Sequence, residues 1–195
     1  MSAATTDRRI EALAIGASAG GIDALFTVLA GLTRPTCAPV IVVLHLPAAH
    51  ESRLAEIFAA RLPLQVREAL PGSRLEPGWL YFAPPDYHLL VEADRSFSLS
   101  CEPPVHYSRP AIDLLFESCA EAYGPGLAAV VLTGANEDGA QGLARVRERG
   151  GLAVVQDPRE AQHAAMPQAA LDLAGADLVL PLAAIQELLP TLICP

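Results

Sequence analysis

Short runs of apolar residues alternate along this chain with segments whose apolar positions follow a helical period. The nearly continuous apolar runs, typical of strands buried on both faces, cover 11–17, 38–46, 127–134, 152–157 and 176–182. Helical spacing is seen over 22–29, 51–61, 111–123, 139–149 and a last segment through 185–189. Strands and helices that alternate in this way predict a parallel sheet covered on both faces by helices.

The stretch 64–101 interrupts this alternation. Its apolar runs are shorter and are broken by "PGS", "PG" and "PPD", which favours small strands and turns over another long helix. We therefore expect an α/β fold of three layers: a doubly wound, mostly parallel sheet, helices on both faces and a small strand or hairpin insertion around 64–101. Residues 1–9 are expected to form a flexible lead, and 10–193 a single domain.

Composition narrows the chemistry that this fold can carry. The 195 residues have a net charge of −9, with 13 Arg and no Lys. The absence of a basic stripe disfavours nucleic acid as a partner, and the absence of Lys excludes Schiff bases, P-loops and Ser–Lys dyads. The four scattered cysteines contain no C-x-x-C pair, which argues against a zinc site. With no apolar run of about 20 residues and no signal peptide, we expect a cytoplasmic protein without membrane insertion.

Three polar side chains come at the ends of buried strands, where parallel sheets place their sites. Ser18 follows the first strand in a glycine-rich turn, so it could be a nucleophile or simply the N-cap of the next helix. His45 ends the second strand and could be the base that such a serine needs, or a satisfied core histidine. Asp138, after Glu137 in "GANEDG", could orient the histidine or mark a plain helix start, whereas two acidic residues disfavour a phosphate-binding loop.

The literal G-x-S-x-G at Gly16–Gly20 raises further alternatives. An α/β-hydrolase would need Ser18 with Asp138 or Asp157 and His163, but in that fold the nucleophile normally follows several strands. A short-chain dehydrogenase needs a lysine that this chain lacks. The Rossmann spacing of three glycines is also missing.

Four motifs occur in an order that is similar to one known family: "IGASAGG" (15–21), "VVLHLP" (42–47), "YSRPAIDLLFESCAEAYG" (107–124) and "VVLTGANEDGAQGL" (130–143). They resemble the catalytic domain of the chemotaxis protein-glutamate methylesterases, the CheB family, and the resemblance extends from about residue 10 to residue 190. It implies a catalytic triad of Ser18, His45 and Asp138. It also implies an oxyanion hole formed by backbone N–H groups near Ala19 and Ala135, with no metal or organic cofactor.

The resemblance further implies a serine hydrolase that demethylates glutamate methyl esters on the cytoplasmic helices of chemoreceptors and deamidates receptor glutamines. Arg109 is then expected to anchor a loop rather than an acidic receptor helix, and Glu137 to face solvent. Two other hypotheses remain: a catalytically weak chemosensory interaction module and a general small-ester hydrolase.

The sequence departs from the family pattern at several places. Ala19 stands where Thr is common, Leu46 where Met often follows the histidine, and "GANEDG" where "GMGxDG" is usual. No receiver domain precedes the first strand, so we expect a standalone esterase. These departures leave the three triad positions intact but affect the expected shape of the substrate groove.

Overall fold

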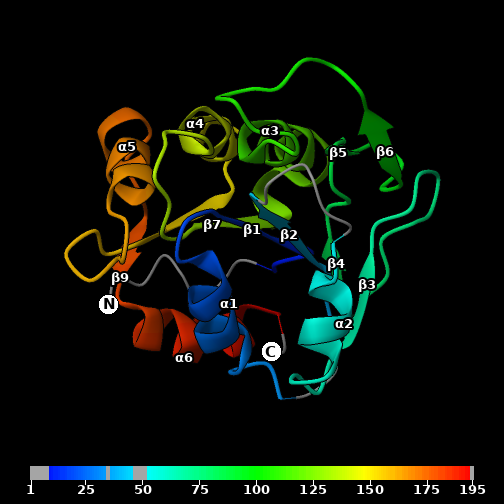
Figure 1. Ribbon diagram of the computed structural model, residues 1–195, viewed down its shortest axis with the longest axis horizontal. Helices are drawn as coiled ribbons and strands as arrows, with labels where there is room; N and C mark the ends of the chain where they lie inside the picture. Colours follow the sequence, from blue (N-terminus) through cyan, green and yellow to red (C-terminus); the bar gives the residue numbers. More distant parts are fainter. Residues whose placement is uncertain (1–8, 34–35, 46–51, 194–195) are drawn as a thin grey trace.

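A parallel sheet forms the centre of the computed structural model, which describes residues 9–33, 36–45 and 52–193 (Figure 1). Seven strands of the described chain pair in parallel in the order β3-β4-β2-β1-β7-β8-β9. Their bounds are β1 Ala12–Ala17, β2 Val40–Leu44, β3 Gln65–Glu68, β4 Trp79–Phe82, β7 Leu127–Val131, β8 Leu152–Gln156 and β9 Leu178–Leu180. Leu46 and most of the expected lead, 1–8, lie outside the described residues.

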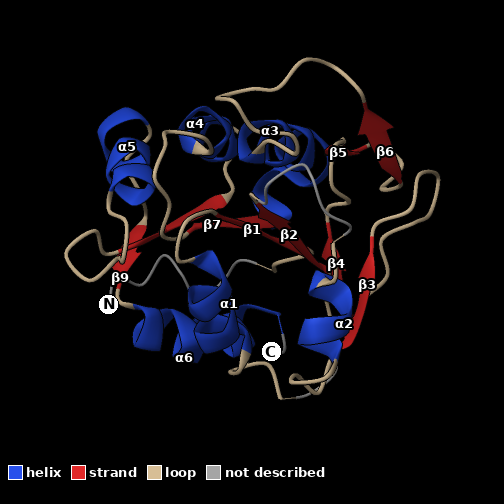
Figure 2. Ribbon diagram, viewed as in Figure 1, coloured by secondary structure: helices blue, strands red, loops and turns tan. Residues whose placement is uncertain are grey.

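Helices cover both faces of this sheet (Figure 2). One layer contains α1 Gly21–Leu29, α2 Leu54–Ala59 and α6 Leu182–Ile193, and the other contains α3 Ile112–Tyr123, α4 Ala140–Glu148 and α5 Ala165–Leu173. A short 3₁₀ turn, Gly124–Gly126, leads from α3 into β7. The doubly wound three-layer α/β fold expected from the apolar pattern is confirmed.

Two segments differ in detail from the expectation. Within 64–101, β3 and β4 join the main sheet, and only β5 His88–Val91 and β6 Phe97–Ser100 form a separate antiparallel pair. Helix α5 was not anticipated. It has a proline in its first turn, and the residues that it buries form only a narrow stripe: Met166, Pro167 and Ala170.

The side chains of β1 divide between two hydrophobic cores. Leu13, Ile15 and Ala17 belong to the core beneath α1 and α6, whereas Ala12 and Ala14 belong to the core beneath α3 and α4. This two-sided burial explains why the strand is continuously apolar. Gly16 in the same strand leaves no room for a Cβ, because Ile112 of α3 lies directly against it. The start of α3 is therefore pressed onto the carboxyl end of β1.

Gly142 allows α3 and α4 to approach each other closely. A Cβ at this position would lie 2.7 Å from both the backbone oxygen of Asp113 and Cβ of Phe116. Alanine normally stabilises an exposed helix by about 1 kcal/mol relative to glycine. Here we expect Gly142→Ala to lower the free energy of unfolding by about 1–3 kcal/mol, because the helices must separate. Urea unfolding measures this, with the exposed neighbour Gln141→Ala as control; equal stability of the two variants would contradict the close contact.

Candidate active site

Ser18 lies in the turn between β1 and α1. Its backbone N–H donates to the Thr133 oxygen at 3.0 Å, and its own carbonyl accepts from Gly21 N–H at 2.8 Å. Gly20 has a φ of 76°, a conformation that favours glycine, and it is the N-cap of α1, with no side-chain capping bond. The alternative in which Ser18 caps α1 is therefore wrong. Ser18 instead lines a hollow of about 270 Å³ together with His45 and Gln162.

His45 follows β2 and is tied to two side chains. Its Nε2 lies 2.7 Å from Oδ2 of Asp138, and its Nδ1 lies 3.2 Å from Oγ of Ser108. An ionised carboxylate only accepts hydrogen bonds, so whenever the imidazole is neutral its ring proton is on Nε2. Nδ1 then accepts a hydrogen bond from the Ser108 hydroxyl. No hydrogen bond joins Ser18 to His45 among the described residues, although both face the same hollow.

Asp138 is fully buried and accepts three hydrogen bonds. Besides His45, its Oδ2 accepts Ile112 N–H at 2.7 Å and its Oδ1 accepts Asp113 N–H at 2.9 Å. The carboxylate thus caps α3, a helix far away in sequence, instead of α4, whose start it precedes. Burial alone would raise the pKa of the Asp138 carboxyl, but the hydrogen bonds from His45 and from these two N–H groups hold it below its ordinary value.

Asp113 makes the reciprocal contact. Its Oδ1 accepts the N–H groups of Gly139 at 2.9 Å and Gly142 at 2.8 Å, so it caps α4 from within the first turn of α3. Burial raises the pKa of this carboxyl to about 6, and the nearby charge of Asp138 adds to the rise, against the lowering effect of the two glycine N–H groups. The two buried aspartates therefore join α3 and α4 at the edge of the site.

The raised pKa of Asp113 has a consequence for stability. Its stabilising contribution is complete below pH 4 and is lost as the pH rises through about 6. Relative to D113N, which can still accept both N–H groups at its amide oxygen, the wild-type free energy of unfolding should fall by roughly 2–3 kcal/mol between pH 4 and pH 7. Urea unfolding of both proteins across this range provides the measurement, and a constant difference between them would contradict the raised pKa.

The other expected site residues lie as follows. Ala19 is half-buried, its carbonyl accepts the Thr133 hydroxyl at 3.0 Å, and its N–H donates to no described residue. Ala135 is exposed.

Glu137 is exposed too and pairs with His106 at 3.1 Å. Arg109 anchors a loop, as expected: its Nε and Nη2 both donate to Oδ1 of Asp86, and its Nη1 donates to the backbone carbonyls of Cys101 and Glu102.

The α/β-hydrolase set is not assembled among the described contacts. The Asp157 carboxylate binds Arg159, and the backbone N–H of His163 donates to the Thr133 hydroxyl at 2.9 Å.

Sequence reasoning missed the roles of Ser108, Asp113 and His106 around the His45–Asp138 pair. All three lie within or next to the motif "YSRPAIDLLF", which was identified without a role for these side chains. It also missed Gln162, whose side chain lies over Gly20 so closely that a Cβ there would be 2.5 Å from its Oε1.

Comparison with known proteins decides the family. A family model described as CheB methylesterase matches residues 13–189. This chain belongs to the CheB methylesterase family. A solved structure, the CheB methylesterase catalytic domain of Thermotoga maritima, is 32% identical, covers 94% of this chain and 99% of its own, and has a TM-score of 0.87.

Two relatives show how family members differ in length. A Leptospira interrogans protein, provisionally named a protein-glutamate methylesterase/protein-glutamine glutaminase, is 45% identical over 91% of this chain and 92% of its own length. A Hahella chejuensis protein-glutamate methylesterase/protein-glutamine glutaminase is 41% identical over 92% of this chain but only 49% of its own length. The chain thus spans nearly all of one CheB relative and about half of the other.

No described helix is both long enough and apolar enough to cross a membrane. Within the same residues, no group of three or more His, Cys, Asp or Glu side chains is arranged to hold a metal ion.

Proposed function

We propose that this chain is a protein-glutamate methylesterase that also deamidates glutamine side chains. The observation that carries the proposal is the His45–Asp138 pair at 2.7 Å, facing the same hollow as Ser18 in a member of the CheB methylesterase family. A serine at a turn before a helix, a neutral histidine and a buried ionised aspartate are the groups that acyl transfer needs.

In the proposed reaction Ser18 is the nucleophile. Its hydroxyl takes the place of Ser108 at Nδ1 of His45 and gives its proton to that nitrogen as Oγ attacks the carbonyl carbon of the glutamate methyl ester. Asp138 keeps the proton of Nε2 in place and stabilises the imidazolium. Nδ1 rather than Nε2 acts as the base, because the aspartate holds Nε2.

Backbone N–H groups near Ala19, at the start of α1, would bind the oxyanion, aided by the positive end of the helix dipole. The N–H groups of Ala19 and Gly20 support this role, since neither donates to a described residue. Ala135, in the loop after β7, is the second proposed donor.

Collapse of the tetrahedral intermediate breaks the bond to the methoxy oxygen, which takes the proton from Nδ1 and leaves as methanol. Water then attacks the glutamyl ester on Ser18, His45 takes its proton, and free glutamate and the Ser18 hydroxyl are restored. The same cycle on glutamine releases ammonia. The proposed substrate is a methylated helix of the cytoplasmic part of a chemoreceptor.

The experiment is methanol release from a methylated receptor fragment, read together with mass spectrometry of the glutamates. Turnover of the protein ester supports the proposal. Tight binding without turnover would instead favour an interaction module, and faster cleavage of p-nitrophenyl esters than of the protein would favour a general small-ester hydrolase.

A further inference from the structure

A tight turn connects the His45–Asp138 pair to the protein surface. The backbones of Val105 and Ser108 exchange hydrogen bonds at 3.1 and 2.8 Å, and the two residues between them, His106 and Tyr107, have φ values of 47° and 64°. Two successive positive φ angles are typical of turns built from Asn and Gly. Here a histidine and a tyrosine occupy them, which stores backbone strain beside the candidate active site.

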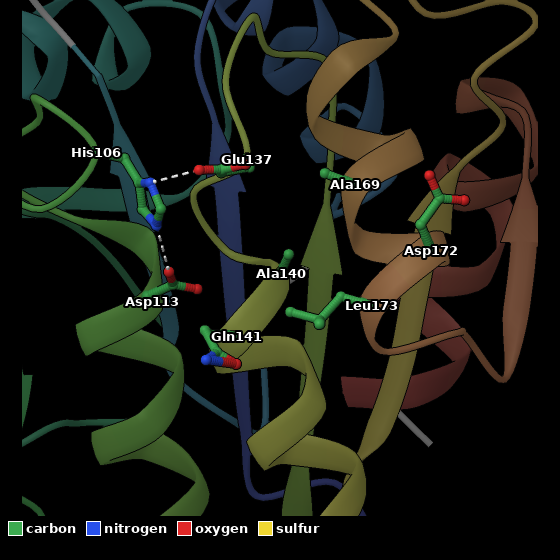
Figure 3. A pocket seen from close by; sticks show the side chains of 8 residues that line it. All are labelled: His106, Asp113, Glu137, Ala140, Gln141, Ala169, Asp172 and Leu173. Carbon is green, nitrogen blue, oxygen red and sulfur yellow. Dashed lines mark ion pairs between the residues drawn. The ribbon is translucent and has the colours of Figure 1, made fainter.

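The side chains on both sides of Tyr107 hold this turn in place. Ser108 Oγ contacts Nδ1 of His45. His106 lies between two carboxylates, with Nδ1 3.1 Å from Glu137 and Nε2 3.4 Å from Asp113 (Figure 3). These contacts come from the loop after β7 and from α3, so the turn is fixed against the elements that position Asp138.

Tyr107 itself is fully exposed at the tip of the turn. The other exposed large apolar side chains of the described chain retain only 42–61% of their accessible surface. An aromatic side chain on a fixed backbone has few rotatable bonds to order when a partner binds, and tyrosine is enriched among residues that dominate binding energy. Strain, fixation and full exposure at one residue together indicate a binding role.

We propose that Tyr107 is a docking residue for the protein substrate, packing its ring on an apolar side chain next to the methylated glutamate. The inference rests on the proposed methylesterase function and adds a specificity determinant to it. Tyr107 directly precedes Ser108, which touches the base, so a protein segment seated over Ser18 and His45 lies within reach of the ring. Tyr107 does not line the hollow that holds Ser18 and His45, so a small ester bound there makes no use of the ring.

The test uses Tyr107→Asn, because asparagine accepts a positive φ better than most residues and keeps the turn while the ring is removed. We expect kcat/KM for a methylated receptor fragment to fall at least about tenfold, mainly through KM. For a p-nitrophenyl ester, kcat/KM should stay within about twofold of wild type. Tyr107→Phe should retain the wild-type values for both substrates, since the ring supplies the contact.

The matched control is Ile57→Ala, which removes an exposed apolar side chain from α2 in the opposite layer and should leave both substrates unaffected. If the wild-type chain releases methanol and the Tyr107→Asn variant has the same kcat/KM for the methylated receptor fragment, the docking role is overturned while the proposed function stands. An equal loss on both substrates would also overturn it, since the turn would then act through Ser108 on the catalytic centre. Absence of methanol release by the wild type would overturn the proposed function itself.

Discussion

Replacing Ser18 by alanine should lower kcat/KM for methanol release from a methylated receptor fragment by about three to six orders of magnitude. The proposed mechanism forms its covalent intermediate on the Ser18 oxygen, and no other described residue that lines the hollow carries a hydroxyl or a thiol. A residual rate above that of the uncatalysed reaction is expected, because substrate binding and the backbone N–H donors remain. Stopped incubations analysed for methanol by gas chromatography cover this range, and trapping of a glutamyl-enzyme by mass spectrometry should fail in the variant.

Ser108→Ala is the decisive comparison, because Ser108 is the serine that contacts His45 in this structure. A neutral hydrogen bond contributes about 0.5–1.5 kcal/mol, so its removal should change kcat/KM by no more than about tenfold. Near-complete loss in Ser108→Ala with normal turnover in Ser18→Ala would assign the nucleophile to the other serine and contradict the mechanism.

Asp138→Asn should have the second-largest effect, a loss of about 10⁴ in kcat. The amide nitrogen can donate to Nε2 of His45 and so favour the tautomer whose proton sits on Nδ1, which leaves the proposed base without its lone pair. The variant should also be less stable by about 1–3 kcal/mol, because both carboxylate oxygens accept backbone N–H groups of α3 and only one oxygen remains. Single-turnover kinetics and urea unfolding measure the two effects separately.

Asp113→Asn is the matched control for this prediction. Both N–H groups that bind Asp113 meet the same oxygen, Oδ1, so one amide oxygen can satisfy them. The control should therefore keep kcat within about tenfold of wild type. Equal losses of kcat in the two variants would mean that Asp138 acts only by holding α3 and α4 together, not through His45.

Much of the fold could be predicted because buried parallel strands leave a continuous apolar run, and β1, β2, β7 and β8 all show one. The four-residue strands β3 and β4, bounded by prolines and glycines, show too little of this pattern to reveal that they join the main sheet. Helix α5 was missed because it buries few residues. The periodicity of apolar residues reflects which side chains are buried. It therefore does not reveal elements that are short or mostly exposed.

The candidate site could likewise be predicted only in part. Ser18 and His45 directly follow β1 and β2, and Asp138 lies in the loop after β7, so the ends of three apolar runs point to these residues. The contact of Ser108 with His45 depends on a turn with positive φ at His106 and Tyr107, and neither residue type signals such a turn. Likewise Asp113 and Asp138 are 25 residues apart in sequence, and their exchange of helix caps follows only from the packing of α3 on α4.

That exchange of caps makes the position of Asp138, the proposed triad aspartate, depend on the packing of α3 against α4. Asp138 has its position and its charge only when the opening turn of α3 lies against it, and α4 keeps its own start only when Asp113 of α3 returns the contact. A chain in which these two helices have not yet come together still contains the serine turn but lacks an oriented base. We therefore expect local separation of α3 and α4 to abolish the proposed hydrolysis before the central sheet itself unfolds.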